Sequence, residues 1–124
     1  MGQYLVAVDI GTGSARAGIF DRQGRTMGRS VVPIAMRVTG SRFAEHNSED
    51  IWHAACRAVK EARDEAGIAP ADVAAIGFDA TCSLVVRGAD GRPLPVSPDG
   101  ETGWDTIAWL DHRAIEEAES LSAL

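Results

Sequence analysis

The sequence predicts an α/β fold with a mixed sheet, in which three antiparallel strands are followed by a crossover helix and a parallel strand. Three observations lead to this fold class: short apolar runs rich in β-forming residues at the start of the chain, one long amphipathic segment, and a continuous apolar run after it. The 124 residues, 45% of them hydrophobic, fit one domain with a packed core.

The first part of the chain has the pattern of an antiparallel meander. Tyr4 to Val8 and Ala15 to Phe20 are apolar runs of strand length, and a third run, Thr26 to Ala35, follows a turn at Asp21 to Gly24. Short polar or glycine-containing connections of this kind join neighbouring antiparallel strands. Residues 37–46 are polar and contain glycine, so we expect a connecting loop there.

A long amphipathic helix is predicted to begin at Asn47 or Ser48, both suitable N-caps, and to stop at Gly67. Apolar residues recur in it at three- and four-residue intervals, and charged residues occupy the other face. Val73 to Phe78 is then a continuous apolar run, which is typical of a buried strand after a crossover helix. A short strand at Leu84 to Val86 and a second helix from about His112 to Ser122 complete the prediction.

Composition limits the partners and the location of the protein. The net charge of -6, without a cluster of Lys and Arg, argues against binding to nucleic acid or to an anionic membrane surface. No apolar run approaches about 18 residues, and no basic segment followed by an apolar one opens the chain, so we expect a cytoplasmic protein. The final helix reaches Leu124 without a polar tail, from which we expect a piece of a longer chain.

The connection between the first two strands has the composition of a phosphate-binding turn. It reads Asp9-Ile-Gly-Thr-Gly-Ser-Ala-Arg16. Gly11 and Gly13 can take positive φ and allow a large anion to approach the backbone. Successive amides in that conformation form an anion-binding concavity, to which the hydroxyls of Thr12 and Ser14 add donors.

Two charged residues flank this turn. Asp9 is poorly suited to contact bare phosphate but well placed to hold Mg2+ or its waters, and Arg16 is placed to reach a terminal phosphate. The turn is not a Walker A loop, because no Gly-Lys-Ser/Thr follows and the next element is a strand. An ordinary glycine-rich hairpin is the alternative interpretation.

Two further segments complete a recognisable pattern: Gly77-Phe-Asp-Ala-Thr-Cys-Ser83 and Trp109-Leu-Asp-His-Arg113. With the phosphate-binding turn, they resemble the FGGY carbohydrate kinases, and more narrowly the ribulokinase branch. Glycerol kinases carry an Arg-Glu pair where this chain has Cys82 and Ser83, and xylulokinases a Met-His pair. The resemblance implies the ribonuclease H-like fold of actin-like ATPases, with residues 1–124 as the N-terminal portion of the first kinase domain.

The resemblance also implies an ATP-dependent kinase that phosphorylates a pentulose, D-ribulose above all, or the related pentitol ribitol. It implies that the turn residues 11–14 and Arg16 bind the β and γ phosphates of ATP, and that Asp9 binds Mg2+. It assigns substrate binding to Asp79, Thr81, Cys82, Ser83 and Asp111. The catalytic base is an Asp expected beyond Leu124, so none of the residues present is assigned that role and we expect this chain alone to be inactive.

Two other functions remain open: a nucleotide-driven module of the actin or Hsp70 type, which needs no sugar pocket, and a sugar-sensing regulator without turnover. Asp79 is equally suited to a structural role, with its carboxylate bonded to loop amides. The sequence leaves the oligomeric state open, a homodimer being one option.

Overall fold

The computed structural model describes residues 2–124, and these form two compact units, each with its own sheet. The first unit comprises Met1–Ile34 and Glu49–Thr81, and the second comprises Ala35–Ser48 and Cys82–Leu124. Residues 35–48 leave the first sheet and pair with the later part of the chain.

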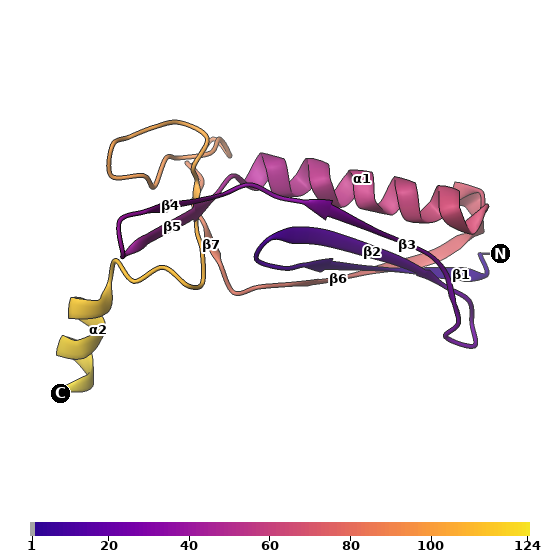
Figure 1. Ribbon diagram of the computed structural model, residues 1–124, viewed down its shortest axis with the longest axis horizontal. Helices are drawn as coiled ribbons and strands as arrows, with labels where there is room; N and C mark the ends of the chain where they lie inside the picture. The colour runs from indigo at the N-terminus through magenta and orange to yellow at the C-terminus, as the bar shows by residue number, and fades with distance from the viewer. Residues whose placement is uncertain (1) are drawn as a thin grey trace. The chain divides into compact units, whose positions relative to one another are not determined.

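The first unit contains the mixed sheet that the sequence predicts. Its strands are β1 (Tyr4–Ile10), β2 (Ser14–Phe20), β3 (Thr26–Pro33) and β6 (Val73–Ala80), in the order β3-β2-β1-β6. β2 runs antiparallel to both β1 and β3, whereas β6 runs parallel to β1. The crossover is α1 (Ser48–Ala66), followed by a 3-10 turn at Pro70–Asp72, and α1 lies along one face of the sheet (Figure 1).

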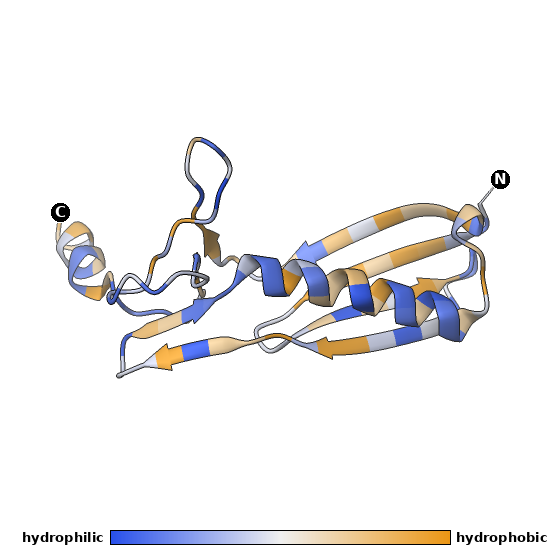
Figure 2. Ribbon diagram, turned by 90° about the horizontal axis from the view of Figure 1, so that it is seen from above, coloured by the Kyte–Doolittle hydropathy of each residue, from blue (hydrophilic) through white to orange (hydrophobic). Residues whose placement is uncertain are grey.

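The core of the first unit lies between α1 and the sheet. Alternate strand residues and one face of the helix supply it: Val6, Val8, Ala15, Ala17, Ile19, Val32, Ile34, Ala54, Ala55, Ala58 and Ala62. The alanines let the helix approach the sheet closely, most of all at Gly28, where a Cβ would lie 2.3 Å from the carbonyl oxygen of Ala62. The outer face of α1 is mainly hydrophilic (Figure 2).

β6 has the predicted position but not the predicted burial. It is an edge strand, and every residue of it after Val73 is exposed. Phe78 is 62% exposed and Trp52, which helical phase predicts to be in the core, is 58% exposed. Together with Ile76 and Cys56 these side chains line an apolar groove of about 240 Å³.

The second unit is held by a small antiparallel sheet with the strand order β4-β5-β8-β7. The loop predicted over residues 37–46 is instead a hairpin, because two polar residues in it, Arg37 and Glu45, are paired with each other rather than with solvent. The elements are β4 (Met36–Thr39), β5 (Phe43–His46), β7 (Leu84–Val85), β8 (Thr106–Ile107) and the helix α2 (Ile115–Ser122). No helix within residues 2–124 combines the length and apolarity needed to cross a membrane.

Candidate functional site

The predicted phosphate-binding turn is a short tip between β1 and β2 with a fixed shape. Gly11 N donates a hydrogen bond to Ser14 O at 2.9 Å, and Ile34 N donates to Gly13 O at 3.1 Å. Neither Gly11 nor Gly13 has a positive φ, so that part of the prediction was wrong. These two backbone hydrogen bonds fix the shape of the tip, and neither requires a residue in the left-handed conformation.

The two glycines differ in their surroundings. A Cβ added to Gly13 would meet nothing within 4 Å, whereas a Cβ on Gly11 would lie 2.3 Å from Nη2 of Arg16. The Gly11 amide is already used inside the turn. The tip is therefore open at Gly13, whereas the Arg16 guanidinium covers Gly11.

Asp9 and Arg16 face each other across β1 and β2 as register partners. Their side chains form an ion pair, with 3.4 Å between Arg16 Nη1 and Asp9 Oδ2, and both are about half exposed. Exposed ion pairs contribute little to the free energy of folding. Either side chain can therefore leave the pair to contact a ligand at a small cost in free energy. The residues present fit a hydrated Mg2+, with Asp9 as the protein ligand and waters or phosphate oxygens as the others. Within residues 2–124 no group of three or more potential metal ligands gathers.

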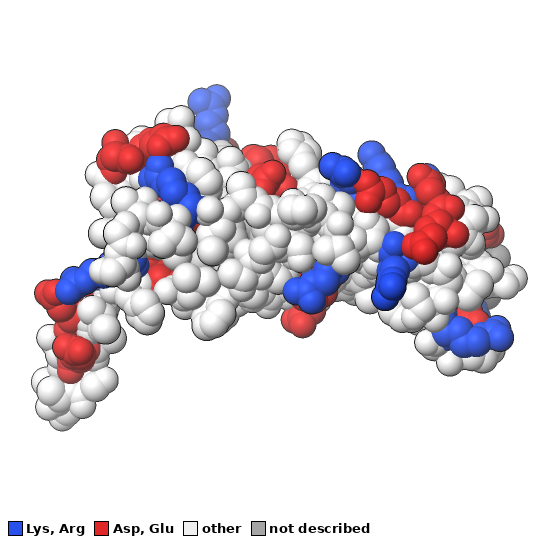
Figure 3. Space-filling model, in the orientation of Figure 1, with Lys and Arg blue, Asp and Glu red and all other residues white. Residues whose placement is uncertain are grey.

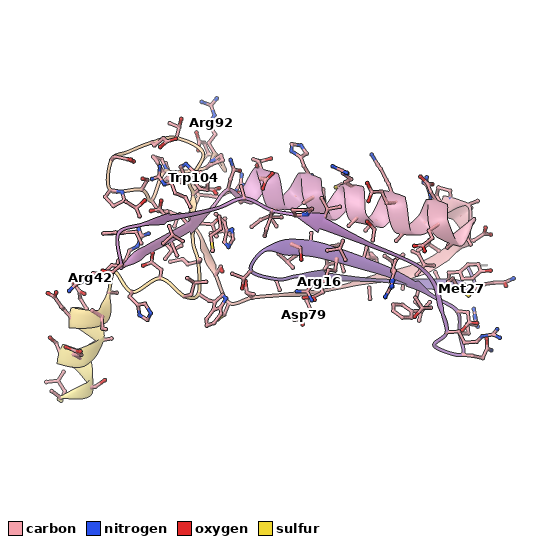
Figure 4. The ribbon with its side chains drawn as sticks, in the orientation of Figure 1. Arg16, Met27, Arg42, Asp79, Arg92 and Trp104 are labelled. Atoms are coloured by element: carbon pink, nitrogen blue, oxygen red, sulfur yellow. The ribbon has the colours of Figure 1, made fainter. Side chains whose placement is uncertain are left out.

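The structure places Asp79 beside these residues. In the parallel pair of β1 and β6, Asp79 is the register partner of Asp9, so both project from the same face of the sheet. Figure 4 shows Arg16 and Asp79 on the side of the sheet opposite α1. All three side chains line a concavity of about 630 Å³. The Asp79 carboxylate also accepts a hydrogen bond at 3.0 Å from the amide of Ala80, the next residue of β6.

The other predicted substrate residues divide between the two units. Thr81 ends the first unit, where its amide donates to Ile10 O at 3.1 Å. Cys82 is an exposed free thiol in the second unit. Ser83 Oγ accepts a hydrogen bond from Trp109 N at 3.1 Å, so the structure joins the two sequence motifs at this point.

Asp111 is bound to the protein through both carboxylate oxygens. Oδ1 accepts from Arg113 N and Nε, and Oδ2 accepts from Arg113 Nη2 and from Ala44 N. Burial opposes the charged form of Asp111, but the hydrogen bonds from Arg113 and Ala44 outweigh it and hold the pKa below its ordinary value. This geometry gives Asp111 a structural role; binding of a sugar hydroxyl by it stays a prediction.

A buried carboxylate that the sequence did not single out lies next to Asp111. Glu45 is 1% exposed and bridges two arginines, with 3.1 Å to Arg37 Nη2 and 2.9 Å to Arg113 Nη2. Arg113 is 68 positions away in the chain, so no local pattern marks the pair. Elsewhere on the face shown in Figure 3, basic and acidic side chains lie beside one another, in keeping with the absence of a Lys and Arg cluster in the sequence.

The mixed sheet, its crossover helix and the hairpin tip define a domain with the actin-like ATPase fold. Solved sugar kinases share this arrangement. The xylulose kinase from Rhodospirillum rubrum superposes with a TM-score of 0.80 at 19% identity, over 98% of this chain and 24% of the kinase. For the gluconate kinase from Lactobacillus acidophilus the TM-score is 0.78 at 20% identity, over 97% of this chain and 22% of the kinase.

The chain belongs to the FGGY family of carbohydrate kinases, whose N-terminal domain matches residues 4–124. It is 40% identical over 123 residues to a D-ribulokinase of Saccharomyces cerevisiae, covering 98% of this chain and 17% of that protein. Identity is 39% over 120 residues to the human FGGY carbohydrate kinase domain-containing protein, over 97% of this chain and 21% of the relative. A glycerol kinase of Thermococcus gammatolerans is 34% identical, over 98% of this chain and 23% of its own length. The chain thus spans about a fifth of the length of these relatives.

Proposed function

We propose that residues 1–124 form the N-terminal part of the first domain of an ATP-dependent kinase that phosphorylates a pentulose, D-ribulose in the first place. Membership of the FGGY family supports the kinase class. The observation that carries the proposal is the hairpin tip between β1 and β2, which is open at Gly13 and has the Asp9–Arg16 pair on the two strands that it joins. The 40% identity to a D-ribulokinase supports a pentulose as the substrate. The 34% identity to a glycerol kinase makes glycerol the competing candidate.

Phosphoryl transfer depends on in-line positioning and on neutralising the charge of the transferred group. In this proposal the β and γ phosphates of ATP lie against residues 11–14. Arg16 turns from Asp9 to the γ-phosphate oxygens, and Asp9 holds the waters of Mg2+. Bound Mg2+ supplies positive charge at the phosphate oxygens. Because Asp79 lies beside Asp9, we assign it to the phosphate end of the substrate site.

On the sugar side, the short side chains of Thr81, Cys82 and Ser83 leave room for a small ligand. The hydrogen bond from Trp109 N to Ser83 Oγ connects them to the second motif. The catalytic base and the adenine pocket are assigned to the chain beyond Leu124. Residues 1–124 alone are therefore expected to give no turnover.

The test is a substrate screen with the full-length protein. ATP and Mg2+ are combined in turn with D-ribulose, L-ribulose, ribitol, D-xylulose and glycerol, and ADP release is followed. We expect the highest kcat/KM for D-ribulose. If no compound is phosphorylated, the kinase proposal is wrong. If glycerol or D-xylulose is preferred, the protein is a carbohydrate kinase but the assignment of D-ribulose as its substrate is wrong.

A pair of variants tests the phosphate site. Arg16→Gln removes the guanidinium at the hairpin tip and is expected to lower kcat by about 10²- to 10³-fold, as for the loss of one donor to a developing negative charge. Arg22→Gln is the matched control, because Arg22 is an exposed arginine that donates to Gly2 O in a different part of the same unit. Equal activity of both variants would argue against the role of Arg16.

The same screen separates the two other functions. An actin-like or Hsp70-like module would hydrolyse ATP without any requirement for a sugar. A sugar-sensing regulator would bind a pentulose, measured by calorimetry, without releasing ADP.

A further inference from the structure

The segment from Val96 to Arg113 carries the second motif and has little regular structure of its own. Its one strand, β8, has two residues. Among residues 96–113, all of which the structure describes, Ala108 is the one buried hydrophobic residue, whereas Ser97, Asp105 and Thr106 are buried polar residues. Polar contacts rather than an apolar core must therefore hold this segment in place.

Glu45, on β5, is the centre of those contacts. Its Oε2 accepts from Arg37 Nε at 3.3 Å and Nη2 at 3.1 Å, and its Oε1 accepts from Arg113 Nη2 at 2.9 Å. A carboxylate that is 1% exposed is costly unless it is paired and hydrogen-bonded. Two guanidinium groups meet that requirement here.

Arg37 extends the contact from Glu45 to the first half of the segment. Its guanidinium bonds to Ser97 and Glu101 and lies 3.4 Å from Asp99 Oδ1. It also lies over the ring of Trp104, 5.1 Å from the centroid. These contacts hold residues 97–104 against the β4–β5 hairpin.

Arg113 joins the two ends of the segment. It donates to Val96 O at 2.7 Å and to both carboxylate oxygens of Asp111 at 2.8 Å. Asp111 in turn accepts from Ala44 N at 2.7 Å, next to Glu45 on β5. Trp109, two residues before Asp111, is thereby held where its amide reaches Ser83 Oγ.

We infer that Glu45 is a positioning residue for substrate binding. Through Arg37 and Arg113 it holds residues 96–113 in position, so that Trp109 in this segment contacts Ser83. This inference rests on the proposed function, because it takes Ser83 and its surroundings as part of the sugar site. Glu45 itself is 1% exposed and acts through the two arginines that it binds. Its loss therefore acts on sugar affinity rather than on ATP binding or on the transfer step.

The experiment compares Glu45→Gln with Glu116→Gln in the full-length protein. Both changes convert a glutamate bound to an arginine of the second unit into its amide, but Glu45 is 1% exposed, whereas the Glu116 side chain is 73% exposed and pairs with Arg42 outside residues 96–113. For Glu45→Gln we expect the KM for the sugar to rise at least about tenfold, with the KM for ATP within about twofold of wild type, and faster amide hydrogen exchange over residues 96–113. For Glu116→Gln both KM values are expected to stay within about twofold of wild type. An unchanged sugar KM for Glu45→Gln would overturn the inference.

A second variant covers the case in which Glu45→Gln does not fold. Arg37→Lys keeps a positive charge beside Glu45 but loses the planar fork that reaches several acceptors. We expect it to raise the sugar KM and to speed exchange over residues 97–104 in the unliganded protein. Normal exchange and normal sugar KM in this variant would contradict the inference.

The two readouts separate the inference from the proposed function. If the wild-type protein phosphorylates none of the sugars, the proposed function fails, and with it the substrate role of the segment. If the wild-type protein is an active kinase but neither variant changes exchange or sugar KM, only the role of Glu45 fails.

Discussion

Asp111 and Arg113 form a two-point ion pair, with 2.8 Å both from Nε to Oδ1 and from Nη2 to Oδ2. The same carboxylate accepts two backbone amides and is 2% exposed. A buried carboxylate with all of its acceptor positions filled makes the surrounding chain rigid. The motif that identifies the family therefore contains a residue whose observed contacts are structural.

Asp111→Asn is expected to destabilise the full-length protein by about 3 kcal/mol at pH 7, because it breaks a buried ion pair and leaves donors of Arg113 unsatisfied. The pKa of Asp111 in the folded state lies below the ordinary value of 3.8. Its stabilisation is thus complete above about pH 3.8 and is lost as the pH falls through the folded-state pKa. The difference in unfolding free energy between wild type and variant, measured with urea, should shrink below that pH. Asp90→Asn, at an exposed carboxylate 3.6 Å from Arg92, should cost little at any pH.

Gly28→Ala should destabilise the first unit by about 1 to 3 kcal/mol through overpacking. Its Cβ would lie 2.3 Å from Ala62 O and 2.8 Å from Ala66 N, and backbone atoms of α1 cannot move aside as a flexible side chain would. Gly77→Ala is the control, because a Cβ on this β6 glycine meets nothing within 4 Å. Thermal unfolding of the two variants should differ clearly; similar midpoints would show that α1 does not pack on β3 at this distance.

Gly13→Ala should separate stability from nucleotide binding. The added methyl group meets no protein atom within 4 Å, so the thermal midpoint should stay close to wild type. In the proposed complex that space holds phosphate, and we expect kcat/KM for ATP to fall about 100-fold or more. An unchanged kcat/KM for ATP would indicate that the phosphates do not approach the tip from this side.

The isolated 124-residue chain should bind a hydrophobic dye such as ANS. Phe78, Ile76 and Trp52 are exposed around one apolar groove, and such patches bind apolar ligands. Phe78→Ser should reduce the fluorescence of the bound dye substantially. Leu121→Ser, at an exposed apolar residue of α2 outside the groove, serves as the comparison, and an equal loss of signal in both variants would contradict a specific role of the groove.

Local patterns were enough for most of the first unit. The strand runs, the glycine stop of α1 and the apolar run after it were predicted within a few residues, because alternation and helical periodicity are visible in consecutive residues. The hairpin of β4 and β5 was missed. Arg37 and Glu45 have the polarity of a solvent-exposed loop, and their burial depends on Ser97 and Arg113, more than fifty positions away.

The sequence by itself determined the succession of three antiparallel strands, a crossover helix and a further strand, the glycine-containing turn between the first two strands, and the motifs that mark the family. Only the tertiary structure decided that Asp79 stands beside Asp9, that Gly11 is covered and Gly13 open, and that Asp111 and Glu45 are buried in one ion cluster. The physical reason is that composition and periodicity are properties of neighbouring residues. Strand register and charge pairing join residues far apart in the chain, and these set what each side chain can reach.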